Sequence, residues 1–295
     1  MDGRDAENHQ SSIIPHQSPV PGIYPGLSFR EYQAIDAVNA TLLWTLKTRS
    51  PLHARYEREH PKPPTPALAL GQALHTLILE PATFAQRYAI RPPCKRNTKQ
   101  GAAIYERFLL DRGGREEIKT DEYETITAIA GRVRAQQCRE LLCAGRAEVV
   151  LLWRDEKTGL LCKARLDYER SDGFTHYLTD LKSCEHAGPE AFTYAVEHYG
   201  YFLQAAYYCE GWRVLTGEDS VWCWLAVEKD PPWITEVHER KPRTCRAGDL
   251  AWRAALDKYA ECVAKNDWPA YGGPHLIEMR DWALAREGVG AFEIQ

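Results

Sequence analysis

The sequence predicts an α/β fold, in which helices flank a central sheet, and three observations support this prediction. Residues 148–182 read as a meander of extended runs at 148–153, 160–168 and 175–182, separated by polar and glycine turns. A further β-prone run, SVWCWLAVEK, occupies residues 220–229. Stretches with the apolar periodicity of helices precede and follow these strands, as is typical of a sheet covered by helices.

The N-terminal part predicts an arm followed by two capped helices. Residues 1–25 are polar and dotted with proline, so we expect a flexible arm there. Ser28 and Glu31 fit a capping box for the first helix. Ser50 followed by Pro51 fits the start of another. The free N–H groups at that second start could hold a phosphate, although a purely structural cap explains the same residues.

Two more helices are expected before the meander. The stretch LALGQALHTLILE, residues 68–80, is apolar and is followed by Pro81, which helps to end it. A histidine in such a helix, here His75, is ordinarily a satisfied core residue. An amphipathic helix is expected over residues 121–142, and Gly145 is expected to end it.

The meander carries the candidate catalytic residues. Asp167 closes the second run, whereas Asp180 and Lys182 are two residues apart on the third and share a face. Glu148 lies at the start of the first run. Carboxylates and an amine that converge in this way suit metal-assisted hydrolysis, because Mg²⁺ and Mn²⁺ prefer hard oxygen ligands. The lysine could then orient or deprotonate the attacking water.

The chain after Lys182 predicts a helix that Gly211 or Gly217 closes. Gln204 and Tyr208 are four residues apart in it and lie on one face. The aromatic residues of this helix would by default form core, yet these two side chains could contact a sugar-phosphate backbone. Residues 26–268 are expected to form one domain, and residues 269–295 a tail.

Several motifs, taken in order, resemble those of a known nuclease superfamily. Glu148, Asp167 and the triplet DLK at 180–182 resemble the PD-(D/E)xK core. GQALH at 71–75 resembles the upstream histidine motif of its RecB-like branch, and QAAYY at 204–208 resembles the Gln-x-x-x-Tyr helix of that branch. The phrases CKARLDY and YGYFLQAAYY are most similar to RecE-type (exonuclease VIII) and phage recombination exonucleases.

The resemblance implies a restriction-endonuclease-like core with a mixed central sheet, and a Mg²⁺-dependent deoxyribonuclease in which Mn²⁺ substitutes well. The residues that it implies are Lys182, Asp180, Asp167 and Glu148 for catalysis, His75, Asp167, Asp180 and Leu181 for the metal, and Gln204, Tyr208 and Ser50 for DNA. Members of this group degrade one strand of duplex DNA from its 5′ end. They work as rings, here expected to be trimers or tetramers, and hand the 3′ strand to a single-strand annealing protein.

Two other functions remain open on the same residues. One is an endonuclease or repair nuclease of the same superfamily, since internal and end-dependent cleavage use the same metal chemistry. The other is a catalytically silent DNA-binding module on this fold, which the intact Asp167, Asp180 and Lys182 disfavour.

Charge is the main constraint on nucleic-acid binding. The net charge of the 295-residue chain is −4, so DNA binding requires a local basic patch. The segment 87–119 is the best candidate, with nine Lys or Arg residues against four acids, and Arg91, Lys95, Arg96 and Lys99 are its candidate DNA contacts. A solvated, partly mobile loop would explain the same charges.

The remaining composition predicts a cytoplasmic protein without an iron–sulfur cluster. The nine cysteines are scattered singly, and Cys223, Cys245 and Cys262 are too far apart for the cysteine trio of some RecB-like relatives. No run of 18 apolar residues exists, and the first ten residues contain no apolar signal core, so we expect neither a membrane span nor a signal peptide.

Overall fold

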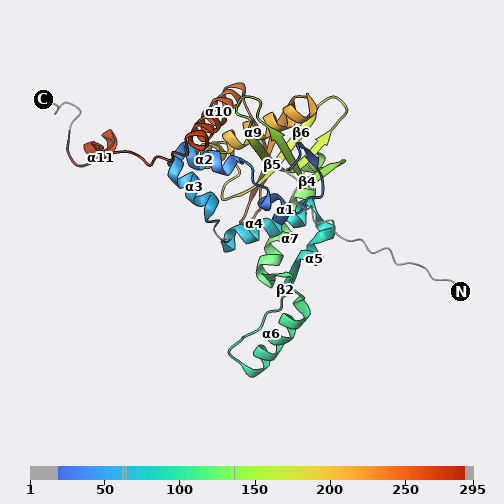
Figure 1. Cartoon of the computed structure of the whole chain (residues 1–295). Coiled ribbons are helices and arrows are strands. Elements are labelled where there is room, and N and C mark those ends of the chain that lie inside the picture. Colours follow the sequence, from blue (N-terminus) through green and yellow to red (C-terminus); the bar gives the residue numbers. More distant parts are fainter. Residues whose placement is uncertain (1–18, 62, 64, 136, 290–295) are drawn as a thin grey trace.

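The computed structural model describes residues 19–289 except 62, 64 and 136, and it shows a mixed sheet with helices on both faces (Figure 1). The sheet has the strand order β1-β4-β5-β6-β7-β8. Its strands are β1 (Gly22–Tyr24), β4 (Gly145–Arg154), β5 (Leu161–Ser171), β6 (His176–Cys184), β7 (Ser220–Glu228) and β8 (Thr235–Glu239). Within this sheet only β6 and β7 pair in parallel, so the predicted meander, its fourth strand and the mixed α/β class are confirmed.

Helices form a separate hydrophobic cluster on each face of this sheet. The helices are α1 (Phe29–Ala34), α2 (Ala40–Thr48), α3 (Pro51–Glu59), α4 (Pro66–Leu79), α5 (Phe84–Arg87), α6 (Lys99–Arg112), α7 (Thr120–Ala135), α8 (Pro189–His198), α9 (Tyr201–Thr216), α10 (Pro242–Lys265) and α11 (Asp281–Arg286). Helices α2, α8, α9 and α10 pack on one face of the sheet, where Trp153 is fully buried. Helices α4, α5 and α7 pack on the other, against Leu181 and Leu225.

The predicted helix starts are confirmed atom by atom. The Ser28 side chain accepts a hydrogen bond from Glu31 N, and the Glu31 carboxylate accepts one from Ser28 N, which completes the capping box of α1. Ser50 caps α3, with Pro51 at its first position. Gly217 ends α9 in the left-handed region, with φ of 77°, where glycine carries no steric penalty.

Three predicted boundaries are wrong, each for a physical reason. Residues 22–24, placed in the flexible arm, form β1 and pair with β4, whereas residues 1–18 lie outside the described part of the chain. The helix expected over 121–142 stops at Ala135, and a 3₁₀ turn (Gln137–Leu142) follows. Gly145 opens β4 and does not end a helix. Glycine is needed at this position because a Cβ would lie 2.1 Å from the Glu169 carbonyl oxygen.

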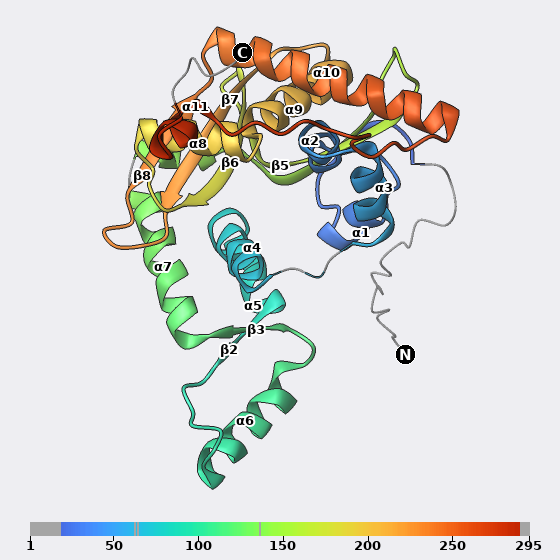
Figure 2. The same ribbon diagram turned by 90° about the vertical axis from the view of Figure 1, so that its left-hand side faces the viewer.

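The basic segment is an ordered projection, not the loop that its charges also allowed. Strand β2 (Tyr88–Arg91) pairs in parallel with β3 (Glu116–Lys119), and α6 lies between them in sequence. Figure 2 shows α6 projecting away from the main sheet. Ion pairs from Arg91 and Arg112 to Glu117, at 2.8 and 4.0 Å, tie the base of the projection together.

The predicted C-terminal tail contains the short helix α11. Eight of the nine cysteines are shown as free thiols, namely Cys94, Cys143, Cys162, Cys184, Cys209, Cys223, Cys245 and Cys262. Within the described part of the chain, we find no helix with both the length and the apolar character that a membrane crossing demands.

Candidate active site

Glu148 and Asp167 face each other across the pairing of β4 with β5. The pairs Ala147–Tyr168 and Val149–Leu166 place them directly opposite, at the point where the ladder is interrupted. Glu148 has a φ of 55°, which is a strained conformation for a residue other than glycine. Two like charges on opposed strands also repel each other. Strain and repulsion at one point of an otherwise regular strand pair mark a functional position.

Asp180, Lys182 and Gln204 form a closed triangle of contacts between β6 and α9. Lys182 Nζ lies 2.9 Å from Asp180 Oδ1 and 2.7 Å from Asp180 Oδ2. Gln204 accepts from Lys182 Nζ through Oε1 and donates to Asp180 Oδ1 through Nε2, both at 3.2 Å. The alternation of side chains along β6 sends Asp180 and Lys182 to one face, as the sequence predicts.

Asp167 connects the strands to α4. Its Oδ2 accepts a hydrogen bond of 2.8 Å from Leu181 N and lies 3.6 Å from His75 Nδ1. Burial lowers the pKa of His75 below its usual value despite the opposing pull of Asp167, so the imidazole is neutral at pH 7. A neutral ring nitrogen beside a carboxylate is a donor pair that a divalent ion can use.

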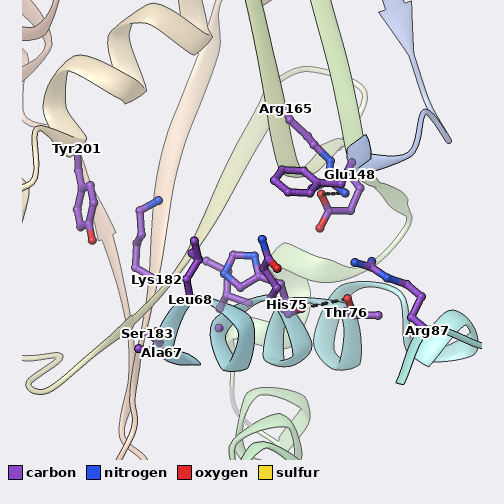
Figure 3. A pocket seen from close by; sticks show the side chains of 14 residues that line it. Ala67, Leu68, His75, Thr76, Arg87, Glu148, Arg165, Lys182, Ser183 and Tyr201 are labelled. Atoms are coloured by element: carbon purple, nitrogen blue, oxygen red, sulfur yellow. Dashed lines mark hydrogen bonds and ion pairs between the residues drawn. The ribbon is translucent and has the colours of Figure 1, made fainter. Parts of the chain in front are cut away.

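Three of these residues, His75, Glu148 and Lys182, line a cavity of about 300 Å³, shown in Figure 3, whereas Asp167, Asp180 and Gln204 lie outside its lining. It is lined by Phe29, Ala67, Leu68, Gly71, Gln72, His75, Thr76, Arg87, Glu148, Arg165, Leu181, Lys182, Ser183 and Tyr201. The lining comes from α1, α4, α5, the three meander strands and the start of α9. Because both sheet and helices contribute, the positions of the polar groups are fixed by the packed core.

Burial disfavours the charged forms of the Glu148 and Asp180 carboxyl groups and so raises their pKa values. It raises the pKa of Glu148 to about 8, with further upward pressure from Asp167 and an opposing effect of Arg165. It likewise raises the pKa of Asp180 to about 7, against the opposing pull of Lys182. Burial lowers the pKa of Lys182, but Asp180 and Asp167 outweigh it, so that the lysine pKa is raised and the ammonium stays charged.

These shifts predict a pH-dependent stability for the metal-free protein. Both groups hold their protons to higher pH in the folded than in the unfolded state, so the free energy of unfolding should fall as pH rises from about 4 to about 8. We expect the melting temperature in EDTA to fall over this window, and Asp180→Asn or Glu148→Gln to flatten the fall. Thermal melts of the three proteins from pH 5 to 8.5 test this, and parallel curves would contradict it.

A divalent ion fits part of this donor set as it stands. Among the residues that the structure describes, no three His, Cys, Asp or Glu side chains converge closely enough to hold an ion. His75 and Asp167 are already adjacent, whereas Asp180 is turned to Lys182 and Gln204. An ion held by all three side chains therefore requires the Asp180 carboxylate to turn from the lysine. The oxygen and nitrogen donors suit Mg²⁺ or Mn²⁺.

Two predicted DNA contacts lie elsewhere. Tyr208 is 8% exposed, packs edge-on against Trp222 in the core and hydrogen-bonds the Gln204 side chain, and like Gln204 it does not line the cavity. Ser50 is buried, and its helix start is closed: Ser50 Oγ accepts from His53 N, while Leu52 N donates to the Pro269 carbonyl. The Ser50 cap therefore has a structural role, and the N–H groups of Leu52 and His53 that a phosphate would need are already hydrogen-bonded.

The four predicted cations of the basic segment lie on the projection and not in the cavity. Arg91 pairs with Glu117, and the Arg96 guanidinium lies over the Tyr105 ring at 4.9 Å. Lys95 and Lys99 flank the start of α6. A DNA path that included them would extend beyond the cavity.

The structure adds cavity residues that the sequence analysis missed. Arg165 pairs with Glu148 at 2.8 Å and lies over the Phe29 ring at 5.0 Å. Lys182 Nζ lies 4.6 Å from the centre of the Tyr201 ring. Arg165 could have been found from its position two residues before Asp167, which places both side chains on one face of a strand. Phe29 carried no such signal, because its place depends on how α1 packs.

Comparison with known proteins gives a family and a fold. A family model described as a "PDDEXK-like domain of unknown function (DUF3799)" matches residues 45–277. No curated protein matches the chain. Among solved structures, a candidate exonuclease from Eubacterium rectale is similar, at 11% identity and a TM-score of 0.55 over 88% of this chain and 94% of that chain. The protein SSO0001 is more distant, at 11% identity and a TM-score of 0.33 over 75% of each chain. The first similarity supports the α/β fold.

Proposed function

Because the chain belongs to the family of PDDEXK-like domains (DUF3799), as the motif resemblance predicted, we propose that it is a metal-dependent DNA exonuclease. Family membership supports a nuclease. The observation that carries the proposal further is the Asp180–Lys182–Gln204 triangle beside Asp167 and His75, of which Lys182 and His75 line one cavity. A silent binding module would have no need to bury carboxylates at such cost.

In this mechanism His75, Asp167 and Asp180 would hold Mg²⁺ or Mn²⁺, with the Leu181 backbone beside His75. A bound ion stabilises charge on the phosphate and makes water more acidic. Lys182 is a charged ammonium, so in this mechanism it stabilises negative charge on the phosphate. It does not deprotonate the attacking water, which is the other role that the sequence allowed. Gln204 orients this ammonium, and Glu148 keeps a further carboxyl group opposite Asp167.

The finer parts of the proposal rest on the RecE-like motifs. They favour degradation of one strand of a DNA duplex from its 5′ end, which leaves 3′ single strands for recombination, as in phage systems. By the same resemblance, the protein would work in the cytoplasm as a trimeric or tetrameric ring, and an annealing protein would receive the 3′ strand.

A requirement for DNA ends is the decisive test of exonuclease action. We expect linear duplex to be degraded in Mg²⁺ while closed-circular duplex of the same sequence survives, because an exonuclease starts only at an end. Gel analysis of both substrates in one reaction measures this. Cleavage of the circle would instead assign an endonuclease, and survival of both substrates would remove the proposal.

The projection is expected to carry part of the DNA affinity. Replacing Arg91, Lys95, Arg96 and Lys99 with glutamine should weaken duplex binding and reduce the slope of log affinity against log salt. Each lost phosphate contact reduces that slope by about 0.9, so four lost contacts give a reduction of roughly 3 to 4. Fluorescence anisotropy between 50 and 200 mM salt measures it.

A charge-matched variant controls for the change in net charge. It replaces four exposed cations on other surfaces with glutamine: Lys157, Arg213, Lys258 and Lys265. An equal loss of affinity in both variants would mean that only the net charge matters and that the projection makes no specific contact.

A further inference from the structure

The candidate active-site cavity has two cationic ends, of which the proposed chemistry uses one. Lys182 and Tyr201 lie at one end, whereas Arg165, Glu148 and Arg87 lie at the other, with His75 on α4 between them (Figure 3). Of the charged side chains that line the cavity, three are cations and only Glu148 is an acid. The Arg165–Arg87 end therefore holds two guanidinium groups, with Glu148 in the lining and Glu80 3.9 Å from Arg87 as their acidic neighbours.

The Arg165 guanidinium has an N–H donor without a hydrogen-bond partner at this end of the cavity. One of its terminal nitrogens, Nη2, lies 2.8 Å from Glu148 Oε2, while its Nε is buried without a hydrogen-bond partner. The guanidinium lies over the Phe29 ring at 5.0 Å, which holds its plane in place. A partly buried guanidinium with an unused donor and a fixed plane suits a ligand with several acceptor oxygens.

Arg87 approaches the same end from α5. It lies 3.9 Å from Glu80, too long for a hydrogen bond, and over the Tyr88 ring at 5.6 Å. About one third of its side chain is exposed. Its guanidinium is therefore supported by an aromatic ring, as is that of Arg165, and is only weakly engaged by Glu80.

We propose that Arg165 and Arg87 form a second phosphate-binding subsite, which takes a backbone phosphate of the bound strand next to the one at which Lys182 acts. The inference rests on the proposed function, since it needs a nucleic-acid strand in the cavity. Guanidinium groups bind phosphate through paired N–H donors, a geometry that a lysine cannot supply. Such a subsite fixes the register of the strand, so that one linkage is presented to Lys182 and Asp167.

A protein–phosphate thermodynamic cycle tests this. Duplexes carry a neutral methylphosphonate at one linkage each, scanned along the strand from its end, and their affinities are measured by anisotropy in EDTA, where no hydrolysis is expected. For the wild-type protein, neutralising the phosphate at the subsite should weaken binding about 10- to 100-fold. Arg165→Met should weaken binding of unmodified duplex by a similar factor. In this variant, a methylphosphonate at the subsite linkage should then cause no further loss of affinity, whereas its effects at the other linkages should be unchanged.

Further variants separate a specific contact from a structural effect. Arg165→Lys keeps the charge but loses the paired donors, so it should behave like Arg165→Met. Arg165→Met/Glu148→Gln removes the acid that Arg165→Met would leave unpaired, and Arg87→Met tests the same linkage at a more exposed position. Arg213→Met, far along α9 and paired with Glu210, is the matched control and should keep every linkage effect of the wild type.

The outcomes distinguish this inference from the proposed function. If all Arg165 and Arg87 variants keep the wild-type sensitivity at every linkage, the subsite does not exist, and this result does not affect the proposal of Mg²⁺-dependent hydrolysis. If the wild-type protein neither binds nor hydrolyses duplex, both proposals fail together.

Discussion

Lys182→Ala is expected to lose about 10²- to 10⁴-fold in turnover, the range for a positioned acid–base or electrostatic group. Lys182 is the charged group that the Gln204 and Asp180 contacts aim at the cavity, and nothing else in the triangle can supply its positive charge. DNA affinity should change much less, because the projection and the arginine end of the cavity are untouched. Single-turnover rates on linear duplex, with affinity measured in parallel, test this expectation.

The chain offers a second buried lysine as a matched control. Lys163 is 5% exposed and donates to the carbonyl oxygens of Tyr32, Gln33 and Ile35 at the end of α1, outside the cavity lining. Lys163→Ala should lower the melting temperature and leave turnover per folded molecule nearly intact, since it removes a structural contact. Lys182→Ala should instead lower the turnover per folded molecule strongly and the melting temperature little. If both lysines lowered only the melting temperature, Lys182 would be a structural partner of Asp180 and the catalytic proposal would fail.

Local patterns predicted the parts of the site that depend on local geometry. A two-residue repeat put Asp180 and Lys182 on one face, and a short turn between strands brought Asp167 beside them. The Ser28 and Ser50 caps were likewise visible, because each satisfies N–H groups only a few residues away.

Contacts between distant segments could not be predicted in this way. Nothing in the Ser50 motif shows that Pro269, over 200 residues later, closes its helix start. Tyr208 has the spacing of a surface partner of Gln204, but the position of β7 behind α9 buries it against Trp222. The charges of the basic segment did not predict α6 either, because the same cations would be expected in a solvated loop. In each case tertiary packing decided which face became solvent-exposed.

Removing the divalent ion is expected to abolish hydrolysis altogether. Without an ion, His75 and Asp167 stay 3.6 Å apart and Asp180 stays bound to Lys182, so no group polarises the phosphate from the carboxylate side. Excess EDTA should therefore stop the reaction, and Mg²⁺ or Mn²⁺ should restore it. Hydrolysis that continues undiminished after chelation would overturn the metal-dependent mechanism.

Asp167→Asn tests the same site by a readout that does not need activity. Asp167 is the carboxylate closest to His75 and has no lysine to release, so it should be the principal anchor of the ion. Its amide keeps one oxygen but loses the charge, and calorimetric titration with Mn²⁺ should show binding weakened by at least about tenfold. Affinity in the wild-type protein should also rise from pH 6 to 8, because Asp180, with its pKa of about 7, must lose a proton before it can bind the ion. Wild-type affinity in the Asn variant would place the ion elsewhere, and an affinity that does not vary with pH would exclude Asp180 from its ligands.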